Sequence, residues 1–140
     1  MTENKLDISR ATEAIKDARF VDALSLLESN LEKDPNHIDS LYLAAVSSRY
    51  LKNYDEAKKY IESLLSQAPD MGRAYQELGH LNRDIGNQEN SIAHYRQACE
   101  LNPALLSSWK ALYDYFRTGN NKPAADHAFM QMNTLESIPS

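Results

Sequence analysis

Three prolines divide this chain at equal intervals. Pro35, Pro69 and Pro103 follow one another at the same spacing. They lie in three similar phrases, LEKDPN, LSQAPD and CELNPA. A fixed period of about 34 residues is typical of repeat proteins, in which each period is one structural unit that packs against its neighbours. The period therefore constrains the fold more than any other feature of the sequence.

Helical spacing of the apolar residues fills the intervals between the prolines. In IDSLYLAAVSSRYL, from Ile38, apolar and small residues recur at steps of three and four, as on one face of a helix. YDEAKKYIESLL, from Tyr54, repeats this pattern after a short polar turn. Each proline disfavours helix at the preceding residue and so separates one helix pair from the next. The pattern predicts eight helices, over Lys5–Asp17, Val21–Lys33, Ile38–Leu51, Tyr54–Gln67, Met71–Ile85, Gln88–Leu101, Leu105–Thr118 and Lys122–Leu135.

The residues within each period resemble those of the tetratricopeptide repeat, whose pattern is W-x2-L-G-x2-Y, then A-x3-F, then P. The third period carries this pattern as Tyr75, Leu78, Gly79, Asn82, Ser91, Tyr95 and Pro103. The fourth carries it as Trp109, Leu112, Tyr113, Phe116, Ala125 and Phe129. The resemblance implies an all-α fold, a single domain over residues 1–140 that forms an α-solenoid of four antiparallel helix pairs in a right-handed superhelix. The repeats would cover residues 4–37, 38–71, 72–105 and 106–139. Gly86 would end the first helix of the third repeat in the left-handed conformation.

Composition and charge exclude several classes of function. The net charge is −5 and no run of Lys and Arg occurs, which argues against binding to nucleic acid. No segment is apolar enough to cross a bilayer or to act as a signal peptide, so we expect a cytoplasmic protein with no membrane partner. One cysteine allows neither an internal disulfide nor a zinc site with several cysteines.

The stretch NSIAHYRQACELNP contains the side chains most suggestive of chemistry. His94 and Cys99 are five positions apart, which places them about 140° apart around a helix, so they cannot form a Cys–His pair. We expect His94 to point outward and Cys99 to be buried, with Leu101 on the inward face. His80 and Asp84 share a helical face, but two ligands are too few for a metal site, and an ion pair is the simpler interpretation. No nucleotide-binding or hydrolase motif occurs, so we expect no catalytic residues, no metal, no cofactor and no enzyme activity.

The resemblance implies a non-catalytic scaffold that binds a protein or peptide partner, either a peptide or a helix, in the concave groove lined by the first helix of each repeat. The predicted groove residues are Tyr42, Val46, Arg49, Tyr50, Arg73, Gln76, Glu77, His80, Arg83, Lys110, Asp114 and Arg117. This lining is apolar and aromatic in the second repeat and charged in the third and fourth. We hypothesise a peptide partner with an apolar anchor at one end and polar or acidic groups at the other. The same charges are equally compatible with an ordinary solvated surface.

The last predicted helix carries apolar residues at a position where repeat arrays commonly have a polar cap. They are Phe129, Met130, Met132 and Leu135. Such a face would be covered by self-association or by a continuation of the chain. The segment NPALLSSWKALYDYFRTGNNKPAADHAF also resembles repeat segments that precede a sulfotransferase domain in some bacterial proteins. An alternative function is therefore an N-terminal accessory domain of a larger enzyme, such as a sulfotransferase, whose catalytic part lies outside this sequence.

Overall fold

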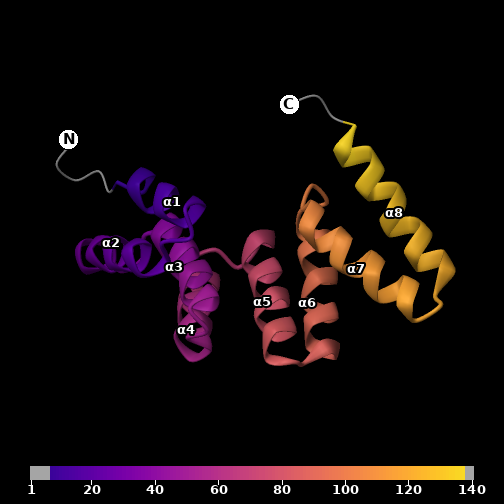
Figure 1. Cartoon of the computed structure of the whole chain (residues 1–140), viewed down its shortest axis with the longest axis horizontal. Helices are drawn as coiled ribbons and strands as arrows, with labels where there is room; N and C mark the ends of the chain where they lie inside the picture. The colour runs from indigo at the N-terminus through magenta and orange to yellow at the C-terminus, as the bar shows by residue number, and fades with distance from the viewer. Residues whose placement is uncertain (1–6, 138–140) are drawn as a thin grey trace. The chain divides into compact units, whose positions relative to one another are not determined.

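The computed structural model describes residues 7–137, and within this range it contains eight α-helices and no strands (Figure 1). The helices are α1 (Ser9–Lys16), α2 (Phe20–Lys33), α3 (Ile38–Tyr50), α4 (Tyr54–Gln67), α5 (Gly72–Ile85), α6 (Gln88–Leu101), α7 (Leu106–Thr118) and α8 (Lys122–Glu136). The predicted all-α fold is confirmed. Every predicted bound agrees within one residue except the start of the first helix, which was placed at Lys5, outside the described residues. No described helix combines the length and the apolar character needed to cross a membrane.

The chain forms two compact units, Met1–Pro69 and Asp70–Ser140. Helices α1 to α4 belong to the first unit, and α5 to α8 belong to the second. The division falls at the predicted boundary between the second and third repeats, within two residues. A single domain over residues 1–140 stays a prediction, and the outer ends of the first and fourth predicted repeats lie outside the described residues.

The turn inside each helix pair is built in the same way in all four repeats. A residue with positive φ closes each turn, and these residues are Ala18 (59°), Lys52 (65°), Gly86 (98°) and Asn120 (59°). They recur at the same spacing as the three prolines. The amide N–H of the next residue donates to the carbonyl five positions earlier, at 2.7 to 2.9 Å, as in a Schellman motif. The prediction for Gly86 is confirmed, and the other three turns use side chains that adopt this conformation at a cost.

Small and aliphatic residues form the core of the first unit. Ala11, Ala14, Ala23, Leu27 and Ala44 make one buried cluster at the crossings of α1, α2 and α3. Alanine at these crossings lets the helix axes approach closely, so that the larger aliphatic side chains fill the remaining space.

Aromatic residues form much of the core of the second unit. Its buried cluster comprises Tyr95, Cys99, Leu112, Phe116, Ala125 and Ala128. Gly79 in α5 faces the ring of Tyr95 in α6, and a Cβ atom added to Gly79 would lie 2.6 Å from that ring. The ring of Tyr95 therefore packs into the space that a side chain at Gly79 would otherwise fill. Leu101, which we expected on the inward face of α6, is instead 37% exposed, because it lies at the last residue of the helix, beyond the packed turns.

Candidate partner-binding surface

The cysteine and histidine of α6 lie in different surroundings. Cys99 is buried, and burial raises the pKa of its thiol to about 12, so almost none of it is thiolate near neutral pH. The expectation that His94 points outward is wrong. Its ring is half-buried and stacks on Tyr75, 6.4 Å between ring centroids, because α5 packs along this side of α6. Within residues 7–137, no group of three or more His, Cys, Asp or Glu side chains is arranged to hold a metal ion.

The predicted groove residues of the first unit differ widely in exposure. Arg49 is only 5% exposed and Val46 is also buried, whereas Tyr42 is half-buried. Tyr50 is exposed, although its ring stacks on Phe20 at 4.6 Å and the Arg49 guanidinium lies 4.5 Å from its centroid. Of the four side chains, the tyrosines therefore present the most surface to solvent.

The predicted groove residues of α5 divide into surface and packing roles. Arg73 and Arg83 are exposed, whereas Glu77 is only 3% exposed. The side-chain oxygen of Gln76 accepts hydrogen bonds from the backbone N–H of Ser108, at 3.1 Å, and from its hydroxyl, at 2.8 Å. Gln76 thus ties α5 to the first turn of α7, so that much of its polar capacity is used within the fold.

A polar network extends from the core of the second unit to its surface. The hydroxyl of Tyr95 lies 2.6 Å from Nδ1 of His80 and accepts a hydrogen bond from Nη1 of Arg83 at 3.4 Å. Nη2 of Arg83 also forms an ion pair with Asp84 at 3.2 Å. His80 and Arg83 were predicted to line a groove, and in the structure both side chains contact the hydroxyl of the buried Tyr95.

The predicted groove residues of α7 are all exposed. Asp114 forms an ion pair with Arg117 at 3.8 Å, one turn further along the helix. The Arg117 guanidinium also lies 5.4 Å from the ring centroid of Tyr113. Lys110 forms no ion pair with any residue of the described range. These three charges follow one side of α7 at steps of three and four residues.

We refer to the exposed charged residues of α5 and α7 collectively as the front face of the second unit. Its members are Arg73, Arg83, Asp84, Lys110, Asp114 and Arg117. The exposed side chains comprise four cations and two anions, and the buried carboxyl group of Glu77 adds a third anion beneath them. The front face is therefore positive in a chain whose net charge is −5.

A pocket of about 400 Å³ opens beside this surface, between α5, α6 and α7; we call it the α5–α7 pocket. Arg83 and Asp114 line it, together with the buried Tyr95. Ile92 and Tyr115 form part of its wall. The structure thus brings together two of the predicted groove residues around a partly apolar cavity.

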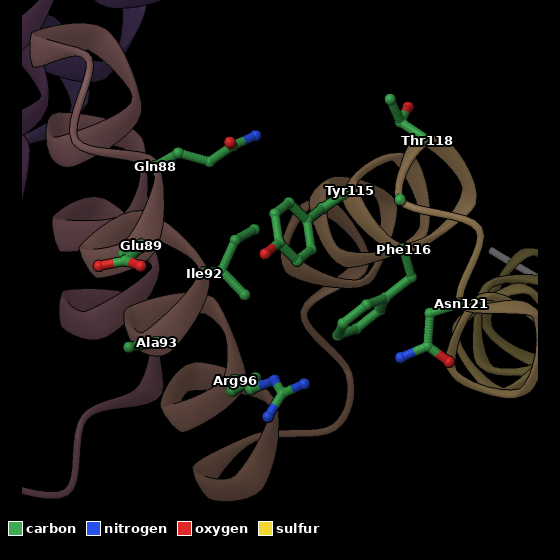
Figure 2. A pocket seen from close by; sticks show the side chains of 10 residues that line it. Gln88, Glu89, Ile92, Ala93, Arg96, Tyr115, Phe116, Thr118 and Asn121 are labelled. Atoms are coloured by element: carbon green, nitrogen blue, oxygen red, sulfur yellow. The ribbon is translucent and has the colours of Figure 1, made fainter.

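A larger pocket of about 650 Å³ lies on the other side of Ile92 and Tyr115; we call it the α6–α7 pocket. Figure 2 shows these two side chains pointing toward each other from α6 and α7, with the ring of Phe116 nearby and Arg96 below. A third pocket, of about 390 Å³, lies between α6, α7 and α8 and also has Arg96 and Phe116 in its lining. The sequence did not reveal these pockets, because each depends on side chains from neighbouring helices that periodicity along one helix does not relate.

Paired helices and turns that recur once in each repeat place this protein in the class of helical-repeat scaffolds. Family models agree with this. One model of the tetratricopeptide repeat matches residues 14–81, and another model of the same repeat matches residues 72–105. The chain belongs to the tetratricopeptide repeat family.

Several solved structures have a similar fold. MamA 41-end from Desulfovibrio magneticus RS-1 aligns with a TM-score of 0.75 and 20% identity, over 96% of this chain and 77% of that chain. Another crystal structure of MamA aligns with a TM-score of 0.75 and 13% identity, over 92% and 75%. The C-terminal part of a TPR repeat-containing protein from Cytophaga hutchinsonii aligns with a TM-score of 0.68 and 20% identity, over 90% of this chain and 50% of that chain. At these identities the likeness concerns the fold alone. No protein of curated function matches the sequence significantly.

Proposed function

We propose that the protein is a non-catalytic interaction scaffold whose second unit binds an acidic peptide or partner helix along its front face. The observation that supports this is the excess of exposed cations on α5 and α7 in a chain of net charge −5. An acidic segment would be drawn to this surface and repelled by most of the remaining molecule. Lys110, which has no ion-pair partner within residues 7–137, is available to such a segment without breaking an existing pair.

The α5–α7 pocket adds an apolar element to this recognition. Ile92, Tyr95, Ala111 and Tyr115 contribute apolar surface next to the charge of Arg83. A segment that places one apolar side chain in this cavity would bring an acidic residue next to Arg83, on the side away from Asp114's own charge. Interface anchors commonly combine a buried apolar contact with an arginine pair in this manner.

A display library of random dodecapeptides, panned on the immobilised full chain, tests the proposal. We expect enrichment of peptides rich in Asp and Glu, which synthetic versions would bind less tightly as salt increases. Arg83→Glu and Lys110→Glu should each weaken binding by about three- to tenfold. Lys122→Glu is the control, because Lys122 is also exposed but lies on α8 and pairs with Asp126 at 2.8 Å. Enrichment of neutral or basic peptides, or no loss in both variants, would refute the proposal.

We further propose that Tyr42 and Tyr50 give the first unit an apolar contact of its own. Tyr50 supports this because its ring is exposed yet held between Phe20 and the Arg49 guanidinium. The rigid ring loses little conformational entropy when a partner covers it. Replacing either tyrosine with alanine should weaken binding of the selected peptides, as measured by fluorescence anisotropy. Unchanged affinity in both variants would limit the binding surface to the second unit.

The outer side of α8 supports a second candidate. Phe129 is 41% exposed and Met130 is 67% exposed, while Met132 and Leu135 are half-buried. We propose that this surface is covered by a second copy of the chain, with the catalytic region of a larger enzyme such as a sulfotransferase as the alternative cover. Light scattering distinguishes them: a dimer that Met130→Glu dissociates supports self-association, and a monomer at all concentrations rejects it.

A further inference from the structure

The guanidinium group of Arg96 lies against an aromatic ring. It lies over Phe116, 5.0 Å from the ring centroid, and the residue is exposed. Within residues 7–137 it forms neither a hydrogen bond nor an ion pair. Stacking on a ring fixes the plane of a guanidinium while leaving its N–H donors directed outward. No residue of the described range therefore uses the N–H donors of Arg96.

Apolar surface flanks this guanidinium on two sides. The α6–α7 pocket, of about 650 Å³, is walled by Ile92, Tyr115 and Phe116. The third pocket, of about 390 Å³, has Trp109 and Leu112 in its wall, together with the polar side chains of Glu100 and His127. Arg96 and Phe116 line both cavities. Figure 2 shows the Arg96 side chain beside the first of them, next to the ring of Phe116.

We propose that Arg96 and the α6–α7 pocket form a second binding site, which takes a partner segment carrying one carboxylate beside a large apolar or aromatic side chain. The carboxylate accepts paired hydrogen bonds from the guanidinium, a geometry that arginine provides and lysine does not. The apolar side chain fills the pocket against Ile92 and Tyr115. This site uses none of the front-face charges and relies on a single cation, although Ile92 and Tyr115 also line the α5–α7 pocket.

Glu89 limits the charge that the site accepts. It lines the same pocket and forms no ion pair within the described part of the chain. A second carboxylate on the incoming segment would meet this like charge, which disfavours binding. The segment therefore carries a single acidic group at this position, unlike the multiply acidic segment that suits the front face.

A small probe that carries both features can test the site directly. We would titrate 3-phenylpropionate into the ¹⁵N-labelled full chain and follow amide chemical shifts, with 3-phenylpropionamide as the neutral isostere. The expected shifts lie at Ile92, Arg96, Tyr115 and Phe116. The carboxylate should bind about fivefold more tightly than the amide, the size expected of a charge-assisted pair at a partly solvated site.

Two variants then separate the charges. In Arg96→Gln the preference for the carboxylate over the amide should disappear, and in Glu89→Gln the carboxylate should bind about two- to threefold more tightly. Arg117→Gln is the matched control and should keep the preference, because Arg117 also lies over a ring but is paired with Asp114. Absence of shifts at the pocket, equal binding of acid and amide, or a preference that survives Arg96→Gln would each overturn the proposal. Independence from the front face is checked with Lys110→Glu, which should leave this titration unchanged.

Discussion

The two units fill the same repeat positions with different side chains. In the first unit, Ala45 in α3 and Ile61 in α4 are both fully buried. The equivalent positions of the next repeat hold Gly79 and Tyr95, so that a smaller residue on one helix accompanies a larger one on the other. Total volume is conserved, which is what a packed core requires. The exchange nevertheless changes chemistry, because the tyrosine brings a hydroxyl that contacts His80 and Arg83 at the surface.

The fourth repeat shows what happens without this compensation. Its corresponding residues are Tyr113 and Phe129, both large, with ring centroids 5.7 Å apart. The two rings cannot both enter the space that Ala45 and Ile61 share, and Phe129 remains 41% exposed. The comparison shows that the combined volume of two facing side chains must match the space between the helices of a repeat. Where that volume is too large, as in the fourth repeat, one ring stays exposed. Where the larger residue is polar, as with Tyr95, its hydroxyl contacts polar side chains at the surface.

The largest effect we expect concerns the reactivity of Cys99, in the aromatic core that the first unit lacks. Because burial raises its pKa to about 12, its reaction with a disulfide reagent at pH 8 should be about a thousandfold slower than in the unfolded chain. The rate of thiol release, measured with and without urea, provides the test. Reaction of the native protein at the unfolded rate would show that the second core opens readily.

Substitution of Gly79 by alanine should be the most damaging of the conservative changes in the core. The new methyl group would lie 2.6 Å from the ring of Tyr95, and we expect the free energy of unfolding to fall by about 2 kcal/mol. Urea denaturation measures this loss. Adding Tyr95→Ile to Gly79→Ala restores the pair found in the first unit and should recover part of the loss. A neutral Gly79→Ala variant would contradict the proposed compensation.

The turns provide a smaller test, with opposite signs in the two units. Lys52 has a φ of 65° in the first unit, and Gly86 has the corresponding conformation in the second. Replacing Lys52 with glycine should raise the free energy of unfolding by about 1 kcal/mol, and Gly86→Ala should lower it by a similar amount. Apart from the adjoining backbone, no atom of the described residues lies within 4 Å of a Cβ built on Gly86, so the second effect isolates backbone strain. Thermal unfolding measures both changes in stability. If the two variants shift stability in the same direction, this explanation is wrong.

The smallest expected effect depends on pH. Burial lowers the pKa of His94 below its ordinary value of 6.5, so the unfolded chain binds a proton more readily than the native one. The contribution of His94 to stability is therefore complete above about pH 6.5 and is lost as the pH falls through the lower native pKa. NMR titration of the imidazole checks the direction of the shift. Tyr75→Ala should expose the ring and return its pKa toward 6.5, and an unshifted wild-type value would contradict the burial.

Much of the fold was predictable because the sequence repeats, so that the helix pattern of each repeat can be compared with that of the others. The helix bounds followed from proline spacing and from periodicity within each interval, and the resemblance identified the repeat. Three of the four left-handed turns were not predicted, since Ala18, Lys52 and Asn120 are not residue types that require positive φ. Their equal spacing from one another and from Gly86 was the available signal.

The candidate site was less predictable for a physical reason. The pattern of one helix indicates which way a side chain points, but exposure depends on what packs against it. His94 was expected outside and is half-buried, because its neighbour Tyr75 comes from α5. Glu77 was expected on the surface and is buried. Arg96 was not singled out, since its significance depends on Phe116, twenty positions away on α7.

The identical turns determine how such a chain can change in length. Each uses one left-handed residue and one hydrogen bond across six residues, so a single inserted residue would break that bond and rotate the following helix by about 100°. Duplication of the segment between two successive prolines would instead reproduce every turn, crossing and core pair in register. The natural unit of growth for this molecule is therefore the whole repeat, and new binding surfaces are gained by changing side chains within copies already in place.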